Sequence, residues 1–204
     1  MDNHGMVSPF LYRVVCCILR IALRICHPVI RVRGRENLPE GAAVLCANHS
    51  HLTDPLWVVG WSRLQRQPRI MAKKELFSNR LFRWFFAKLG AFPVDRGNTD
   101  IKAIKNALQT LKEDNKLLIF PEGTRVRKGK VSQPHSGAVL LAHRVHAPLV
   151  PVYLSVQKGL FRPILLKFGT PYFPDFGGSK PDAAALEAHS TELMANIYAM
   201  GEQQ

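Results

Sequence analysis

The sequence holds little of what a metal centre or a disulfide framework requires. Its four cysteines lack the CxxC spacing of a zinc site, and two of them, Cys16 and Cys17, are adjacent in an apolar segment. This pattern predicts reduced thiols in a reducing compartment, each serving as a small apolar residue of the interior. Internal repeats and low-complexity segments are also absent from the sequence, which speaks against repeat architectures.

Acidic residues are scarce beside basic ones. The 204 residues include 28 Lys and Arg but only 15 Asp and Glu, which gives a formal net charge of +13. Such an excess predicts an anionic partner: a nucleic acid, a membrane surface or a phosphorylated substrate. The sequence has no recognisable zinc-finger or RNP-like motif, and its aromatic residues stand in apolar runs such as "LFRWFF". We therefore expect no nucleic-acid partner.

Long uncharged runs are lacking at the N-terminus, although "FLYRVVCCILRIALRIC" (10–26) is strongly apolar. Its longest uncharged run is the six residues 14–19, whereas a membrane-spanning helix needs about 20 residues with few charges. A cleaved signal peptide does not fit either, because arginines interrupt the apolar core. Arg13, Arg20 and Arg24 fall on one helical face. The segment predicts an amphipathic helix at an anionic membrane interface; the alternative is a helix packed on its own domain with its arginines in water.

Past this helix, short β-like runs alternate with helical patterns. Strands are predicted over 29–34, 42–47, 69–73, 116–120, 149–155 and 164–169, and helices over 81–90, 100–114, 137–146 and 181–200. In the second of these helices, the expected buried face consists of Ile101, Ile104, Leu108 and Leu111.

The length and composition predict one domain. With 47% hydrophobic residues in 204, the chain can bury one full core. The alternation of elements predicts an α/β domain over 29–204, with a mixed, mostly parallel sheet flanked by helices, and an N-terminal amphipathic helix within 1–28. The only plausible linker is the Gly- and Pro-rich segment 169–182.

Groups suited to proton transfer or to anion binding follow three of the predicted strands. "CANHSHLTDP" (46–55) places His49 and Asp54 behind the strand 42–47. "GAFPVDRG" (90–97) and "LLIFPEGTRVRKGK" (117–130) follow later extended runs. Because reactive groups gather beyond the carboxyl ends of the strands of an open α/β sheet, these loops predict a functional site.

The motifs resemble those of the glycerolipid acyltransferase family, of which 1-acylglycerol-3-phosphate acyltransferase is typical. His49 and Asp54 match the His-x4-Asp motif, "FPVDRG" matches the second block, "FPEGTR" the third and "APLVPV" (147–152) the fourth. The resemblance covers roughly residues 29 to 155. A lone His-x4-Asp is a weak signal, but its combination with FPEGTR behind a strand is specific.

The resemblance implies transfer of an acyl group from a thioester to a hydroxyl. His49 would be the general base, since the unperturbed pKa of imidazole, about 6.5, lies near operating pH. Asp54 would orient the ring and stabilise the imidazolium, as in a serine-protease triad whose serine is replaced by the substrate hydroxyl. No acyl-enzyme, cofactor or metal is required. A metal cluster of His49, His51 and Asp54 lacks a third neutral donor at suitable spacing.

The resemblance also implies how the substrates are held. Arg96 and Arg125 would bind the phosphate of the acceptor, with the backbone N–H groups of Gly123 and Thr124 as further donors. A binding role for Glu122 is inherited from the family; it could equally anchor an arginine or order the loop. Lys73 and Lys74 face either the phosphates of the acyl donor or water.

The expected partners are an anionic membrane surface, a lysophospholipid acceptor and acyl-CoA or acyl carrier protein. We expect a peripheral or monotopic protein on the cytoplasmic face of a bacterial membrane. Two departures from the family bear on specificity: His51 stands where many members have serine, and Ser136 stands where members often have lysine. Alternatives are another acceptor, such as glycerol 3-phosphate, or a catalytically silent lipid-binding protein on the same fold.

Overall fold

The computed structural model describes residues 8–95, 100–126, 133–178 and 180–202. Within them, seven strands form one sheet in the order β1-β7-β6-β2-β5-β3-β4. Their bounds are Ile30–Arg33 (β1), Ala43–Ala47 (β2), Arg69–Lys73 (β3), Ala91–Val94 (β4), Lys116–Ile119 (β5), Leu149–Leu154 (β6) and Ile164–Phe168 (β7). The five strands from β6 to β4 run parallel, while β7 runs antiparallel to β6 and carries β1 parallel to itself. The predicted mixed, mostly parallel sheet is confirmed.

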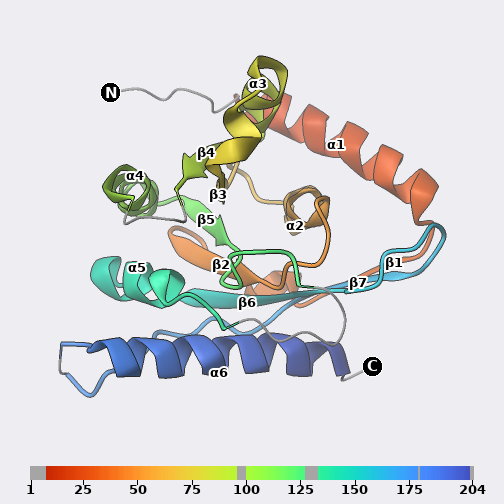
Figure 1. Ribbon diagram of the computed structural model, residues 1–204. Coiled ribbons are helices and arrows are strands. Elements are labelled where there is room, and N and C mark those ends of the chain that lie inside the picture. The colour runs from red at the N-terminus through yellow and green to blue at the C-terminus, as the bar shows by residue number, and fades with distance from the viewer. Residues whose placement is uncertain (1–7, 96–99, 127–132, 179, 203–204) are drawn as a thin grey trace.

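Helices cover both faces of this sheet (Figure 1). One core cluster joins the sheet to α1 (Pro9–Cys26), α2 (Asp54–Ser62) and α3 (Arg80–Lys88). The other joins it to α4 (Ile101–Lys112), α5 (Gly137–Val145) and α6 (Ala183–Glu202). In β2, Leu45 faces the first cluster and its neighbours Val44 and Cys46 face the second, as the alternation of side chains along a strand requires. Two single turns of 3₁₀-helix complete the elements, η1 (Arg35–Asn37) and η2 (Lys74–Phe77).

Helix α2 is the helix that the sequence did not predict, and β4 is a strand that it gave only as a short extended run. The loop after β2 ends at Asp54, where the helix begins. Trp57, Val58 and Trp61 are all buried, so the helix is apolar around most of its circumference. Such a helix lacks the one-sided periodicity by which helices are recognised in a sequence.

Three further expectations are wrong. Ile101 is exposed, because α4 turns Ala103 and Ala107 toward the sheet instead. Segment 169–182 is no linker: Tyr172 pairs with Leu149, and Phe176 packs against the second core cluster. All four cysteines lie in the described part of the chain and are free thiols, but two of them, on α1, are exposed rather than buried: Cys17 and Cys26.

Helix α1 has one packed face and one exposed apolar face. Tyr12 and Cys16 are buried against the domain, and α1 packs on α2. The opposite side exposes large apolar residues: Phe10, Leu11, Val14, Ile18, Ile21 and Ile25. At about 100° per residue, the three arginines of α1 lie between these two faces. Among the described residues, no helix combines the length and apolar character needed to cross a bilayer.

Candidate active site

The two residues after β2 fix the position of the predicted base. Asn48 is fully buried, and its side-chain amide exchanges two 2.8 Å hydrogen bonds with the backbone of Leu154 on β6. The loop therefore leaves β2 tied to the neighbouring strand. His49 comes next, and its ring packs on Phe120 with the ring centroids 4.4 Å apart.

His49 and Asp54 are brought together as predicted. The Nδ1 of His49 lies 2.9 Å from Oδ2 of Asp54, and the side chains are 14% and 0% exposed. The same carboxylate oxygen accepts backbone N–H bonds from Ser50 (2.7 Å) and His51 (2.8 Å). Because Oδ2 only accepts, Nδ1 carries the proton and Nε2 keeps its lone pair. The pair has the geometry of a general base and its orienting carboxylate.

Lys158 completes this pair and was missed by the sequence reasoning. Its Nζ lies 2.7 Å from Oδ1 of Asp54 and 2.9 Å from the Ser50 hydroxyl, and its side chain is 2% exposed. Burial by itself raises the pKa of Asp54, but the bond from His49 and the charge of Lys158 outweigh it and hold that pKa below its usual range. Burial lowers the pKa of Lys158, and Asp54 partly offsets the effect. Asp54 is thus held as a carboxylate.

The third block, FPEGTR, and the residue after it hold the backbone of His49 through hydrogen bonds. Glu122 is buried and accepts the backbone N–H of His49 at 2.6 Å and the hydroxyl proton of Tyr198 on α6. The N–H of Val126 donates to the carbonyl of His49 at 2.8 Å. Burial raises the pKa of Glu122, although the bonds from Tyr198 and His49 work against this. Glu122 therefore orders the loop that carries His49.

The turn of this block requires its glycine. Gly123 has φ +65°, and a Cβ at this position would lie 2.5 Å from the ring of His135. Its N–H donates to the carbonyl of Phe120 at 3.0 Å, so this predicted substrate donor is engaged within the turn. The two residues that follow, Thr124 and Arg125, are exposed beside the His49 loop.

The remaining predicted contacts lie along the same edge of the sheet. β2, β5, β3 and β4 are adjacent and parallel, so the loops at their carboxyl ends are neighbours. Lys73 ends β3 and Lys74 begins η2; both are exposed and are ion-paired, with Glu75 at 3.3 Å and Asp95 at 2.5 Å respectively. Arg96 lies outside the described residues.

A cavity opens next to this edge. It has a volume of about 410 Å³ between the sheet and helices α4 and α5, and it reaches Phe120 and Gly123. Its lining is about half aliphatic, with Met71, Ile104 and Leu140 among the contributors, and it also includes Asp95, Asp100 and Arg144. His51 is exposed, and the described residues contain no group of three His, Cys, Asp or Glu side chains placed to hold a metal ion.

A sequence profile of the Acyltransferase family matches residues 29–155, which include His49, Asp54 and the FPEGTR loop. The chain belongs to this family. The resemblance found in the motifs is thereby confirmed, and the span of the match equals the one expected from them.

Two curated relatives of this chain are 1-acyl-sn-glycerol-3-phosphate acyltransferases. The chain is 37% identical over 156 residues to 1-acyl-sn-glycerol-3-phosphate acyltransferase of Bacillus subtilis, covering 74% of this chain and 76% of that protein. It is 35% identical over 134 residues to the protein of the same name from Streptococcus pneumoniae, covering 63% of this chain but only 49% of that one. A crystal structure of the 1-acyl-sn-glycerophosphate acyltransferase of Thermotoga maritima superimposes with a TM-score of 0.73 at 22% identity, over 96% of this chain and 81% of that one, and shows the same fold.

Three site residues lay outside the motif reasoning. Asn48 directly precedes the histidine, but no local pattern marks it as a link to β6. Lys158 follows the fourth block, and only the adjacency of β6 and β2 brings it to Asp54. Tyr198 sits on the last helix, far from any block. Knowledge of the strand order would have given one signal: Lys158 follows β6, the strand that pairs with β2.

Proposed function

We propose that this protein transfers a fatty acyl group from an acyl thioester to the free hydroxyl of 1-acylglycerol 3-phosphate, giving phosphatidate for phospholipid synthesis. The observation that carries the proposal is the buried Asp54 carboxylate on Nδ1 of His49, which leaves Nε2 as a proton acceptor next to the FPEGTR loop. The names of the relatives supply the acceptor.

The reaction needs one proton transfer and one exchange of bonds at the acyl carbon. Nε2 of His49 takes the proton of the acceptor hydroxyl as its oxygen attacks the thioester carbonyl. The C–O bond forms, the C–S bond breaks, and the departing thiolate takes the proton from the imidazolium. Asp54, kept ionised by Lys158, stabilises that imidazolium. No acyl-enzyme is required, because the acceptor supplies the nucleophile.

The substrates are assigned to the carboxyl edge of the sheet. Arg125, exposed beside the His49 loop, binds the acceptor phosphate together with Arg96 and the N–H of Thr124. Lys73 and Lys74 at the end of β3 lie where they can meet the phosphates of acyl-CoA or of acyl carrier protein. The apolar cavity beside Phe120 is suited to an acyl chain.

The site is assigned to a membrane surface. The exposed apolar face of α1 lies beside the stripe of Arg13, Arg20 and Arg24, an arrangement that suits the boundary between acyl chains and anionic headgroups. We infer a peripheral or monotopic protein on the cytoplasmic face of a bacterial membrane.

The deciding experiment is thiol release by the purified protein. Long-chain acyl-CoA and acyl carrier protein are each offered with lysophosphatidate, glycerol 3-phosphate or lysophosphatidylcholine. Turnover with lysophosphatidate that falls about 10²- to 10⁴-fold in His49→Ala, but not in His51→Ala, is the expected result. Preference for glycerol 3-phosphate would keep the mechanism and change the acceptor. No turnover with any pair would favour a silent lipid-binding protein.

A further inference from the structure

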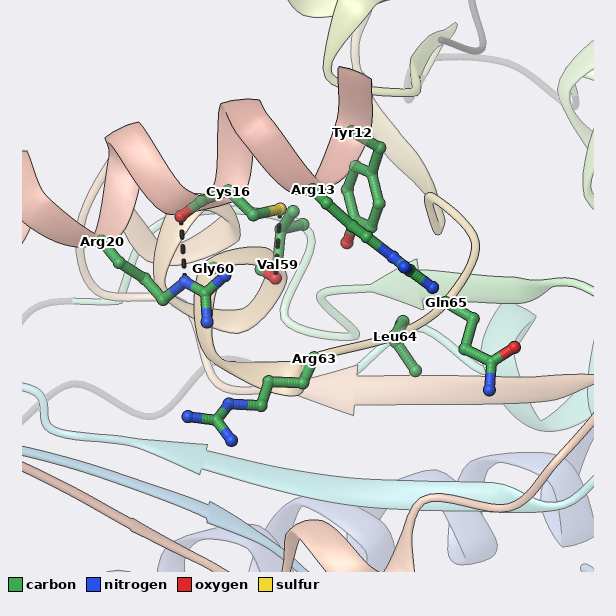
Figure 2. Close-up of a pocket in the computed structure, with 9 residues that line it drawn as sticks. All are labelled: Tyr12, Arg13, Cys16, Arg20, Val59, Gly60, Arg63, Leu64 and Gln65. Carbon is green, nitrogen blue, oxygen red and sulfur yellow. Dashed lines mark hydrogen bonds between the residues drawn. The ribbon is translucent and has the colours of Figure 1, made fainter. Parts of the chain in front are cut away.

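A second cavity lies between α1 and the end of α2, away from the proposed reaction. Its volume is about 260 Å³, and Figure 2 shows that it is lined by residues of α1, by Val59 and Gly60 of α2 and by Arg63, Leu64 and Gln65 just after α2. It lies at the Ser62 end of α2, whereas Asp54 begins that helix. Nine helical residues at about 1.5 Å each separate the two ends by roughly 12 Å. A group bound here is therefore distinct from the one that reacts at His49.

The lining of this cavity is strongly basic. Arg13, Arg20 and Arg63 contribute to it, and none of the described residues that line it is acidic. Arg20 is held in place by a 3.0 Å bond from its Nε to the carbonyl of Cys16, which leaves its terminal amino groups available. Within the described part of the chain, no carboxylate forms an ion pair with any of the three.

The concentration of positive charge affects a neighbouring arginine. Arg35 donates from Nε to the carbonyl of Trp61 beside the cavity. Burial lowers the pKa of Arg35, and the charges of Arg63 and Arg20 lower it further. Several guanidinium groups thus gather around the end of α2, where a bound anion would reduce their mutual repulsion.

A buried hydroxyl in the same lining also lacks a partner. Tyr12 is 3% exposed, and its hydroxyl lies near the Cys16 thiol and the Ser62 hydroxyl without a hydrogen bond of standard geometry to any described residue. Burial raises the pKa of Tyr12, so the hydroxyl stays protonated and is a donor. A buried polar group without a partner is costly, and an acceptor in the cavity would satisfy it.

We propose that the cavity between α1 and α2 binds the phosphate group of an anionic membrane lipid that is not itself undergoing acyl transfer. The donors present, guanidinium groups and a phenol, suit phosphate oxygens. The lipid source follows from α1, because the arginine stripe borders an apolar face that would reach acyl chains when the phosphate is seated. The proposal deepens the membrane association proposed above and rests on it.

The test is binding of the full chain to phosphatidylcholine vesicles doped with phosphatidylglycerol, an anionic lipid that is neither substrate nor product of the proposed reaction, compared by flotation. Three variants remove cavity donors: Arg13→Gln, Arg63→Gln and Tyr12→Phe. The matched control is Arg24→Gln, which removes the same charge from the same helix but does not line the cavity. We expect roughly fivefold weaker binding for the control, from the general attraction alone. Arg13→Gln and Arg63→Gln should each lose about tenfold or more, and Tyr12→Phe about threefold.

The outcomes separate this proposal from its premise. If the wild-type protein floats with no vesicle, the membrane association itself fails. If it floats and Arg13→Gln and Arg63→Gln bind as well as Arg24→Gln does, only the cavity proposal is overturned, provided that circular dichroism shows the variants folded. Inorganic phosphate is the third arm. Inorganic phosphate could stabilise the wild type against heat but not Arg63→Gln, while all variants bind vesicles equally well. This combination would assign the cavity to free phosphate and overturn the lipid assignment.

Discussion

The ammonium of Lys158 lies 2.7 Å from Oδ1 of Asp54, on the side of the carboxylate opposite to His49. Both side chains are essentially removed from solvent. A buried ion pair contributes little net stability, but removing one partner leaves an uncompensated charge in the interior. The contact therefore helps to hold Asp54 in the ionised form that the proposed mechanism requires.

Replacing Lys158 tests this relationship. Lys158→Met should lower the free energy of unfolding by about 3 to 5 kcal/mol, measured by urea denaturation. In the variant that remains folded, Asp54 loses the neighbouring positive charge that lowers its pKa, so this pKa rises and the acid limb of the kcat/KM profile moves to higher pH. Lys102→Met, at an exposed position on α4, is the control. An unchanged pH profile would show that Lys158 has only a structural role.

Substitution of Glu122 separates a positioning role from substrate binding. Because burial raises the pKa of Glu122, its contribution to stability is present below about pH 4.3, the unfolded value, and is lost as pH rises through the folded value. Glu122→Gln should therefore be at least as stable as the wild type at pH 8, because the variant buries no charge there. Its KM for the acceptor should stay within about threefold of the wild type. A KM raised tenfold or more would point to direct contact with substrate.

The phosphate clamp is tested at Arg125. Loss of a charge-assisted bond to phosphate costs about 1.5 to 3 kcal/mol, so Arg125→Ala should raise KM for lysophosphatidate roughly ten- to hundredfold. Turnover of monoacylglycerol, which has no phosphate, should change little. Arg66→Ala removes an exposed arginine elsewhere and serves for comparison. Equal KM values for the two variants would rule out this role.

The exposed face of α1 offers a matched pair of isoleucines. Ile18 is 62% exposed on α1, and Ile101 is 63% exposed on α4, on the other side of the sheet. Ile18→Glu should weaken vesicle flotation at least tenfold, because it places a charge among acyl chains and repels anionic lipid. Ile101→Glu should have little effect. Point substitution is preferable to deletion of residues 1–26, since Tyr12 and Cys16 belong to the core. Similar flotation of both variants would move the membrane contact away from α1.

The sequence predicts most of the architecture because, in most elements, apolar residues recur at the spacing of either a strand or a helix. The strands that surround β2 and the amphipathic helix α4 were recognised within a few residues of their bounds. Helix α2 was missed because it is buried on nearly every side. On α4, Ile104, Leu108 and Leu111 pack on the core as expected, and only Ile101 was misplaced, because the small residues Ala103 and Ala107 face the sheet instead.

The residues of the candidate site also fall into two groups, those that the sequence predicted and those that it did not. His49, Asp54 and the FPEGTR loop were found because each motif is local and specific. Lys158 and Tyr198 were not, because their contacts join segments separated by more than 70 residues, and only the order of strands and the packing of α6 bring them together. Long-range polar contacts of this kind leave no periodic signal in a sequence.

The bond from Tyr198 to Glu122 has a consequence for biogenesis. Chain synthesis supplies His49, Asp54 and the FPEGTR loop well before α6, yet the carboxylate that holds the backbone of His49 is completed by a residue of α6. During translation, the parallel strands can begin to pair while the catalytic loop still lacks this support. Docking of α6 is thus a late step of folding, and until it occurs Glu122 lacks the bond from Tyr198.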